Sequence, residues 1–431
     1  MNLQIKPASY LEGSIIAPAS KSYTIRVLFI ACLAGRTIVV GPSNSQDAIV
    51  AKSVCSKLGA KIKKVKGNTW LINGVKGKLS FPSKINVQES GTSLRFLLSL
   101  ATLTDKKIEI TGCKTLSARP NRALLKVLRK LGAKIRGKGV QESVPIIVET
   151  GNITSGNIAI DGRLSSQFIS SLLITLPLLS SKSSLKILGN YIVSLPYIDM
   201  TKVVLKLAGI KITRTNKRHF LIAGRQRFKG LKRFVVPADY GLAAFIIGAG
   251  ILCKSQITIK GIGFDKLIQA DKNILPIIRR MGVKLKVSKA FIKIRGPQNL
   301  KGAMLNLKDS PDLVPVVAVL ALFAQGKTRI YGIGHVRLKE SDRISDLRKE
   351  LIKTGADIRE KKDELIIYPK KALKGGITLD PHQDHRLAMA FSILGLKLGL
   401  QVKNIECVKK SYPNFLSDLK AIKAQIVTLH R

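Results

Sequence analysis

Long apolar stretches recur along the chain about every seventy residues, and each begins just after a group of polar side chains. The stretches begin near six residues: Thr24, Thr92, Gln167, Gly241, Leu313 and Arg386. A period of this length predicts a repeated structural unit and decides the architecture. Because the polar groups occupy equivalent points of the repeat, they are candidates for a common site.

A second pattern repeats with the same period and predicts how each unit is built. Amphipathic runs such as residues 124–131 precede a glycine, and alternating residues such as 61–65 follow it. Glycine ends helices because it takes the left-handed conformation without a Cβ clash. The glycines are Gly59, Gly132, Gly209, Gly282 and Gly355, and a weaker sixth copy without glycine covers residues 419–427. Each unit therefore contains an apolar helix, a strand, an amphipathic helix and two short strands.

Length and composition indicate a large globular protein. A chain of 431 residues with 45% apolar residues predicts two domains, each with its own core. The longest apolar stretches, 241–253 and 313–324, are shorter than the roughly 20 residues that span a bilayer, so we expect buried helices.

The N-terminus and the cysteines indicate a cytoplasmic protein. The first residues form neither a secretory apolar core nor an Arg- and Ser-rich transit segment. Five scattered cysteines, odd in number and without paired spacing, suggest reduced thiols.

The net charge of +48 comes from 74 Lys and Arg against 26 Asp and Glu. Basic proteins often bind nucleic acid through counterion release. Here, however, lysines are spread over every repeat, and aromatic residues make up only 5% of the chain and do not alternate with basic ones. We therefore interpret the charge mainly as background, and expect its field to steer small polyanionic substrates.

The polar groups of the first three repeats favour anion binding. Ser20-Lys21-Ser22 opens the first apolar helix, with Arg26 one turn further in. Ser90-Gly91-Thr92 with Arg95 repeats the arrangement, and Ser165-Ser166-Gln167 offers two hydroxyls and an amide. Helix N-termini bind anions through unpaired N–H groups and the helix dipole. An ordinary serine cap with solvated charges is the alternative for each group taken alone.

The last three repeats supply acidic groups. Asp312 stands at the start of an apolar helix, where it is a candidate acid or base or, alternatively, an N-cap. Residues 337–343 hold five charged side chains in seven positions, after a turn with Gly332 and Gly334 that favours a site over a solvated helix start. In Asp384-His385-Arg386 the arginine suits a carboxylate or phosphate clamp. Together with His382, this segment is only a weak metal-site pattern.

These residues, in order, resemble the motifs of the EPSP synthase family of enolpyruvyl transferases, over nearly the whole chain. The matching segments are Ser20-Lys21-Ser22 with Arg26, Gly91-Thr92 with Arg95, Arg119-Pro120, Ser165-Ser166-Gln167, Pro196-Tyr197-Ile198-Asp199, Lys339-Glu340-Ser341-Asp342-Arg343, Asp384-His385-Arg386 and Lys410-Ser411-Tyr412-Pro413. The resemblance implies an α/β protein, a two-domain inside-out α/β barrel with three βαβαββ units in each domain. Residues 20–237 would form the shikimate 3-phosphate side. Residues 1–19 with 238–431 would form the acid–base side, and the active site would lie in the cleft between the domains.

The resemblance also implies a reaction, the transfer of the enolpyruvyl group of phosphoenolpyruvate to the 5-hydroxyl of shikimate 3-phosphate. Phosphate is released, and no metal or organic cofactor takes part. The catalytic residues would be Asp312, Glu340 and Lys21. Phosphoenolpyruvate would be bound by Lys21, Gly91, Arg119, Gln167, Arg343, Arg386 and Lys410. Shikimate 3-phosphate would be bound by Lys21, Ser22, Arg26, Ser165, Ser166, Gln167, Ser194, Tyr197, Asp312, His335 and Lys339. We expect a cytoplasmic monomer with no nucleic-acid or membrane partner.

Some positions depart from the family pattern, and they put details of substrate contact in question. Glu89 and His335 stand where many members carry Asn, and Leu195 where some carry Lys. The serine pair that often follows the equivalent of Asp239 is absent. Gly91 keeps the small residue that leaves room for glyphosate, so sensitivity to this inhibitor is predicted.

Two other functions stay open at this point. UDP-N-acetylglucosamine enolpyruvyl transferases are similar and carry a reactive cysteine before their Arg-Pro, where Cys113 stands here. The spacing is one residue longer, Lys21 is followed by Ser22 rather than Asn, and an isolated cysteine is usually a small packed residue. The other function is binding of nucleic acid, as in a protein similar to RNA 3′-terminal phosphate cyclase, which is built from related units.

Overall fold

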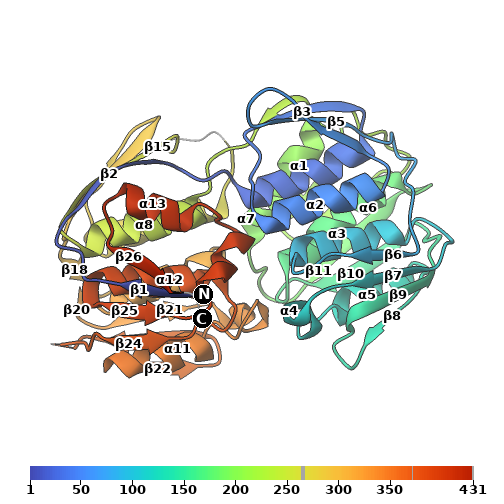
Figure 1. Ribbon diagram of the computed structural model, residues 1–431. Helices are drawn as coiled ribbons and strands as arrows, with labels where there is room; N and C mark the ends of the chain where they lie inside the picture. Colours follow the sequence, from blue (N-terminus) through green and yellow to red (C-terminus); the bar gives the residue numbers. More distant parts are fainter. Residues whose placement is uncertain (264–266, 371, 430–431) are drawn as a thin grey trace. The chain divides into compact units, whose positions relative to one another are not determined.

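The computed structural model describes residues 1–263, 267–370 and 372–429. The chain divides into two compact units (Figure 1). We call Ala19–Pro237 the continuous unit, and Met1–Pro18 together with Ala238–Arg431 the split unit. The chain thus begins in the split unit, builds the continuous unit, and returns.

The continuous unit contains three successive helix pairs with their strands. In order, its elements are α1 (Lys21–Leu33), β3 (Arg36–Val40), α2 (Gln46–Lys57), β4 (Lys61–Lys64), β5 (Thr69–Asn73), β6 (Lys84–Asn86), α3 (Gly91–Ala101), β7 (Ile108–Thr111), α4 (Lys114–Ser117), α5 (Arg122–Lys130), β8 (Lys134–Lys138), β9 (Ser143–Thr150), β10 (Asn157–Asp161), α6 (Ser166–Thr175), η1 (Leu176–Leu178), β11 (Ser183–Leu188), α7 (Leu195–Leu207), β12 (Ile212–Asn216), β13 (His219–Ile222) and β14 (Lys232–Val235).

The split unit repeats the pattern and adds the first two strands of the chain. Its elements are β1 (Asn2–Ile5), β2 (Leu11–Ile16), α8 (Tyr240–Leu252), β15 (Ser255–Lys260), η2 (Ala270–Asn273), α9 (Ile274–Arg280), β16 (Lys286–Val287), β17 (Phe291–Gly296), β18 (Leu300–Lys301), β19 (Met304–Asn306), η3 (Pro311–Leu313), α10 (Val314–Ala321), β20 (Ala324–Gln325), β21 (Thr328–Tyr331), η4 (Gly334–Leu338), α11 (Ser345–Leu351), η5 (Ile352–Thr354), β22 (Asp357–Lys361), β23 (Glu364–Tyr368), β24 (Ile377–Leu379), α12 (His385–Leu398), β25 (Leu400–Val402), η6 (Ile405–Lys410), α13 (Phe415–Ala421) and β26 (Ile426–Leu429).

The six repeats predicted from the sequence correspond to six four-stranded sheets of one topology among the described residues. In β6-β7-β9-β8, for example, the first two strands are parallel and the remaining pairs antiparallel, and Ile110 of β7 lies between Ile85 and Ile146. Apolar side chains alternate along these strands, so one face of each sheet packs on the helices.

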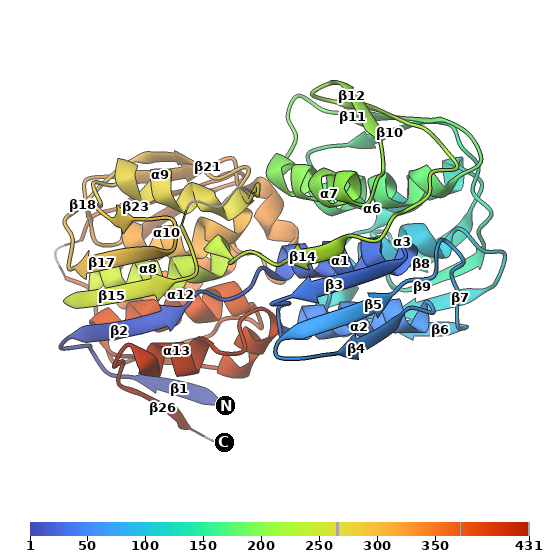
Figure 2. The ribbon, with the colours of Figure 1, turned by 90° about the horizontal axis from the view of Figure 1, so that it is seen from above.

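Three strands complete sheets far from their own place in the sequence. In the continuous unit β14 pairs in parallel with β3 of the first sheet. In the split unit β2 pairs with β15 (Figure 2), and β1 lies between β25 and β26 (Figure 1). Each of these sheets is therefore assembled from segments far apart in the sequence.

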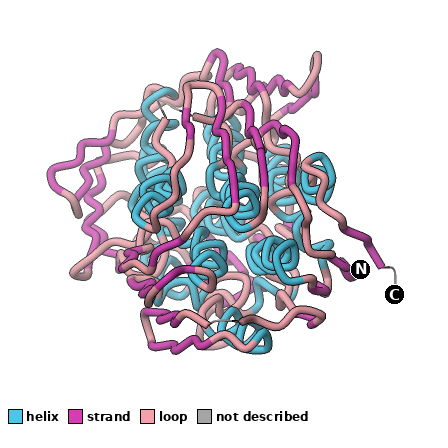
Figure 3. Tube along the Cα trace, turned by 90° about the vertical axis from the view of Figure 1, so that its left-hand side faces the viewer, coloured by secondary structure: helices cyan, strands magenta, loops and turns pink. Residues whose placement is uncertain are grey.

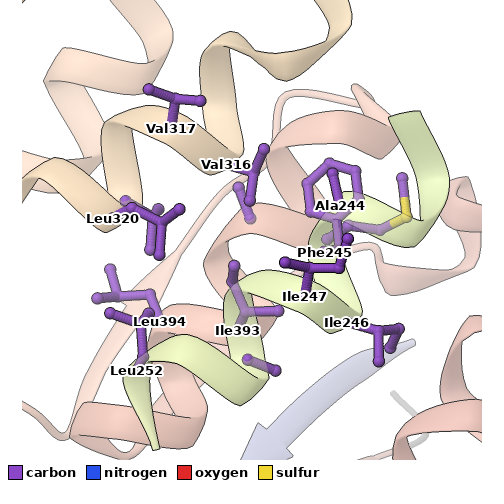
Figure 4. Packing of buried hydrophobic residues seen from close by; sticks show 14 of the residues in the cluster. Ala244, Phe245, Ile246, Ile247, Leu252, Val316, Val317, Leu320, Ile393 and Leu394 are labelled. Carbon is purple, nitrogen blue, oxygen red and sulfur yellow. The ribbon is translucent and has the colours of Figure 1, made fainter. Parts of the chain in front are cut away.

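The apolar helices form the core of each unit, inside the sheets (Figure 3). In the split unit α8, α10 and α12 pack on one another through side chains that include Phe245, Val316 and Ile393 (Figure 4). In the continuous unit Phe29 of α1 meets Phe96 of α3 edge to face at 5.4 Å. Each such buried side chain stabilises the fold by about 1.5–3 kcal/mol through removal of apolar surface from water.

The helix-ending glycines take the predicted conformation. Gly59 has φ +103° and Gly132 φ +111°, and the equivalent glycines of the next three repeats also have positive φ. A side chain at these positions would strain the backbone. The periodically spaced glycines therefore lie at the ends of helices, as predicted.

One predicted helix is shorter than its apolar stretch. The run from 313 to 324 was expected to form one buried helix, but α10 ends at Ala321. Ala324 begins β20, which pairs in parallel with β18 at Leu300. Leu322 and Ala324 are buried beyond the end of this helix, and Ala324 lies in the short two-stranded sheet. Among the described residues, no helix has the length and apolar character needed to cross a membrane.

Candidate active site

The first helix of the continuous unit brings a buried lysine next to a buried aspartate. The Ser20 hydroxyl caps α1 by accepting from the Tyr23 N–H, as an ordinary serine cap does. The Lys21 ammonium lies 2.9 Å from the Asp47 carboxylate, and both side chains are largely buried. The alternative that the Lys21 charge is simply solvated is therefore wrong.

Arg26, one turn further along α1, is 2% exposed and held on three sides. Its guanidinium donates to the Thr201 hydroxyl at 2.9 Å and to the Ser22 and Tyr197 carbonyls at 2.9 and 3.1 Å. The ring of Tyr197 lies 5.7 Å from the guanidinium carbon. Burial lowers the pKa of Arg26 to about 10, and Tyr197 and Tyr23 oppose this shift, so the side chain stays cationic at neutral pH.

Two arginines converge on the start of α3. Arg95 donates to the Gly91 carbonyl at 3.2 Å and to the Pro120 carbonyl at 3.3 Å. A Cβ added at Gly91 would lie 2.5 Å from the Arg119 guanidinium and 2.8 Å from that of Arg95. Only glycine allows both cations to lie over this helix N-terminus, which itself favours an anion.

The third repeat contributes hydroxyl and amide groups. Ser165 caps α6 by accepting from the Gln167 N–H at 3.2 Å. The Gln167 side chain donates to the Thr92 hydroxyl at 3.0 Å and so joins the second and third repeats. Ser166 and Ser194 are buried, and Ser194 precedes α7 with φ +54°. Of the residues predicted for this unit, the structure thus brings Arg26 next to Tyr197, and Gly91 next to Arg119.

The split unit builds its site around Arg343, which is 1% exposed. Its guanidinium lies 2.8 Å from Asp312, 3.0 Å from Glu340 and 2.7 Å from Asp384. Burial by itself lowers the pKa of Arg343, but Asp384, Glu340 and Asp312 raise it above the ordinary value. A buried arginine with several carboxylates is a fixed cation that holds those carboxylates in defined positions.

Asp312 is not the helix cap that was one expectation for it. It lies within η3, and the N-cap of α10 is Leu313. One carboxylate oxygen faces Arg343 and the other lies 2.9 Å from Arg386. Its side chain is 21% exposed, so this carboxylate is both oriented by two arginines and accessible.

Arg386 and Lys410 complete the cationic side of this group. Asp384 caps α12 by accepting from the Arg386 N–H at 2.8 Å. The Arg386 guanidinium donates to the Gly241 carbonyl at 2.5 Å, and a Cβ at Gly241 would overlap the Asp271 carboxylate. The Lys410 ammonium, 2% exposed, lies 3.4 Å from Glu340.

His335, predicted as a substrate contact, is buried near these charges. Its pKa is lowered to about 3, chiefly by burial and also by Lys339 and Arg343, while Asp312 opposes the shift. The imidazole is therefore neutral at physiological pH. Its Nε2 atom is buried and makes no hydrogen bond to any described residue.

Sequence and structure comparisons identify the fold and the chemistry that such a set of residues belongs to. The family model of EPSP synthase (3-phosphoshikimate 1-carboxyvinyltransferase) matches residues 5–419. The chain belongs to the EPSP synthase family. It is 41% identical over 430 residues to the 3-phosphoshikimate 1-carboxyvinyltransferase of Methanocaldococcus jannaschii, covering 98% of this chain and 99% of that one. It is 39% identical over 435 residues to that of Methanococcus vannielii, with the same coverage.

Solved structures agree with the EPSP synthase fold. An EPSP synthase from Acinetobacter baumannii superimposes with a TM-score of 0.81 at 26% identity, covering 99% of this chain and 100% of that one. The enolpyruvyl transferase NikO from Streptomyces tendae has a TM-score of 0.80 at 17% identity, covering 99% and 98%, and shows the fold alone. The predicted two-domain α/β fold is confirmed, and the family match favours EPSP synthase over both other candidate functions.

Two residues near the predicted sites were not identified from the sequence. Asp47 contacts Lys21, and Thr201 contacts Arg26. Asp47 had a weak signal, since it lies in the first turn of a helix that Ser45 caps. Thr201 had none, because it is distant from Arg26 in the sequence. Asp384 was identified as part of a motif, but its contact with Arg343 was not predicted.

Cys113 differs from what was expected of it. Cys113 is exposed, so it is not the packed residue that an isolated cysteine usually is. Within the described ranges, no group of three or more His, Cys, Asp or Glu side chains is placed to hold a metal ion, and this includes the segment around His382.

Proposed function

We infer that the protein transfers the enolpyruvyl group of phosphoenolpyruvate to the 5-hydroxyl of shikimate 3-phosphate. The products are 5-enolpyruvylshikimate 3-phosphate and phosphate, in the biosynthesis of aromatic amino acids through chorismate. Membership of the EPSP synthase family supports this reaction. The observation that carries it at the residue level is the group around Arg343, in which oriented carboxylates stand beside buried cations.

The two anionic substrates are bound by residues of both units. For phosphoenolpyruvate we propose Lys21, Gly91, Arg119 and Gln167 of the continuous unit and Arg343, Arg386 and Lys410 of the split unit. For shikimate 3-phosphate we propose Lys21, Ser22, Arg26, Ser165, Ser166, Gln167, Ser194 and Tyr197, together with Asp312, His335 and Lys339. The buried guanidinium groups support these assignments, since charge-assisted hydrogen bonds to phosphate and carboxylate are strong.

The proton chemistry falls to Asp312, Glu340 and Lys21. Asp312 takes the proton of the 5-hydroxyl as its oxygen attacks C2 of phosphoenolpyruvate. Glu340 or Lys21 gives a proton to the methylene carbon, which becomes a methyl group in a tetrahedral intermediate. Loss of one methyl proton and of phosphate then regenerates the double bond. The two arginines that contact Asp312 hold its carboxylate in a fixed position, as a general base requires.

His335 contributes a neutral contact to the sugar. Because its pKa is lowered to about 3, the imidazole adds no positive charge to a site already rich in cations. Its buried Nε2 atom is available for a hydroxyl of shikimate 3-phosphate. The departure from the usual Asn thus keeps a neutral hydrogen-bonding group at this position.

We further propose a cytoplasmic monomer without a nucleic-acid partner, and an enzyme sensitive to glyphosate. The inhibitor prediction rests on Gly91, where a larger residue would push on Arg119 and Arg95. Full activity at millimolar glyphosate with ordinary substrate concentrations would contradict it.

The deciding experiment measures phosphate release from phosphoenolpyruvate with two acceptors. We expect rapid release with shikimate 3-phosphate and none above background with UDP-N-acetylglucosamine. The reverse preference would overturn the proposed function. Salt-sensitive retention of RNA without phosphate release would favour a nucleic-acid-binding protein instead.

A further inference from the structure

The turn between β24 and α12 has an unfavourable backbone and leads directly into the site. His382 and Gln383 have φ +50° and +61°, so two successive non-glycine residues are left-handed. Each such residue costs about 1 kcal/mol or more, and the surroundings must hold it in place. The next residue is Asp384, which is fully buried against Arg343.

Glu350 of α11 contacts both the backbone and a side chain of this turn. It is 1% exposed, and its Oε2 atom accepts from the Asp380 N–H at 2.8 Å and from the Lys353 ammonium at 2.6 Å. Its Oε1 atom lies 3.4 Å from Nε2 of His382. Asp346, one helical turn earlier on the same face, lies 4.0 Å from the same nitrogen. The proposed reaction uses none of these groups.

The segment of α11 and the turn 380–383 are therefore joined by two separate sets of contacts. Arg343, which lies just before α11, binds Asp384, which lies just after the turn. Glu350 within α11 contacts both Asp380 and His382 of the turn. The contacts of Glu350 with the turn therefore set the separation between Arg343 and Asp384.

We propose that His382 is a positioning residue, and that its protonated form ties the turn 380–383 to α11 and keeps Asp384 in place against Arg343. The inference rests on the proposed function of Arg343 as a ligand of phosphoenolpyruvate. Nε2 of His382 is buried and makes no hydrogen bond to a described residue, and it lies 3.4 Å from Glu350 and 4.0 Å from Asp346. An imidazolium is attracted by both carboxylates, whereas a neutral imidazole is not. We therefore expect phosphoenolpyruvate to be bound more tightly when His382 is protonated.

The charges around His382 agree with this direction. The carboxylates facing it are Asp346 and Glu350, with Asp380 on its own turn, and the cations next to them are Lys353 and Lys349. Burial raises the pKa of Asp346; His382 lowers it, and nearby Asp342 raises it. More carboxylates than lysines lie around His382, so a protonated His382 brings the local net charge closer to zero.

The test compares the KM for phosphoenolpyruvate of His382→Ala, His382→Lys and wild type at about pH 6 and about pH 8. Ratios to wild type are used because they cancel the ionisation of the substrate itself. We expect His382→Ala to raise this KM roughly two- to fivefold at the lower pH and by less at the higher pH. His382→Lys, cationic at both pH values, should match wild type at the lower pH and bind phosphoenolpyruvate more tightly than wild type at the higher.

The matched control is His219→Ala, a histidine of the continuous unit that contacts Ser184 and Thr215. Its ratio should stay near one at both pH values, and the KM for shikimate 3-phosphate should be unchanged in all three variants. An equal ratio for His382→Ala at both pH values, or a His382→Lys variant that behaves as His382→Ala does, would overturn the proposal. Failure of the proposed function is distinguishable, because wild type would then release no phosphate with shikimate 3-phosphate.

Discussion

The two units surround their cations with different partners. In the continuous unit Arg26 and Arg95 donate to carbonyl and hydroxyl oxygens. In the split unit Arg343 contacts three carboxylates, and Arg386 and Lys410 each contact one of the same carboxylates. Both sets are buried.

This difference shows how one repeated fold supports both substrate binding and proton transfer. A cation held by neutral groups keeps its charge for an incoming phosphate, so it suits binding. A cation held by carboxylates also orients those acids for proton transfer, in addition to the phosphoenolpyruvate binding that we propose for Arg343, Arg386 and Lys410. In the continuous unit Lys21 pairs with Asp47, and it is also the one residue there that we place in the proton chemistry.

The largest expected effect is on turnover, in Glu340→Gln. Loss of a positioned proton carrier should lower kcat about a thousandfold while shikimate 3-phosphate still binds. Steady-state phosphate release checks this, with Glu12→Gln, an exposed glutamate paired with Lys423, as the matched control. A kcat within tenfold of wild type would remove Glu340 from the mechanism.

A binding effect should follow from Arg26→Met in the continuous unit. Removing a charge-assisted contact to a phosphate group should weaken shikimate 3-phosphate binding by roughly a hundredfold, with a smaller change in kcat. Arg36→Met, at an exposed arginine of β3, should leave binding unchanged. If Arg26→Met lowered kcat and left affinity intact, the division between the two units would be wrong.

Two variants, Gly91→Ala and Gly241→Ala, test in each unit whether a glycine is needed beside a buried arginine. A Cβ at Gly91 collides with Arg119 and Arg95, and one at Gly241 collides with Asp271 and comes within 3.1 Å of Arg386. Each should raise the KM for phosphoenolpyruvate about tenfold, and Gly91→Ala should also reduce inhibition by glyphosate. Kinetics with unchanged KM in both variants would show that the guanidinium groups move aside at no cost.

The smallest effect concerns stability in acid and isolates His335. Its pKa is near 6.5 in the unfolded chain but about 3 in the folded protein, so the unfolded chain binds the proton first. The stability contributed by the neutral form is complete above pH 6.5 and falls by about 1.4 kcal/mol per pH unit below it. Urea unfolding should show a shallower loss in His335→Asn between pH 7 and about pH 5, and no such change in His219→Asn.

Much of the fold could be predicted from the sequence because its signals are local. The apolar helix starts and the glycines Gly59 and Gly132 lie within each repeat, and periodicity reports them directly. The pairing of β1 with β25 could not be predicted in this way, because strand pairing over almost the whole chain leaves no local pattern. The same holds for the early end of α10, which depends on a partner strand.

The site shows the same limit. Arg343 and Asp312 were identified as candidate residues, but their mutual contact joins residues 31 positions apart in the sequence. Asp312 was open to interpretation as a helix cap because that role depends only on neighbouring residues. Whether a carboxylate caps a helix or binds an arginine depends on distances between elements, which only the folded protein defines.

The central claim is that the split unit supplies the base and most of the proton chemistry, while the continuous unit supplies most of the contacts to the phosphorylated sugar. Asp312→Asn tests it most directly, with phosphate release and the Kd for shikimate 3-phosphate measured on the same preparation. The amide keeps the shape and a hydrogen bond but cannot accept the hydroxyl proton. We predict a fall in kcat of at least about a hundredfold with a Kd within a few-fold of wild type. Unchanged turnover, or a loss of affinity as large as the loss of rate, would contradict the account.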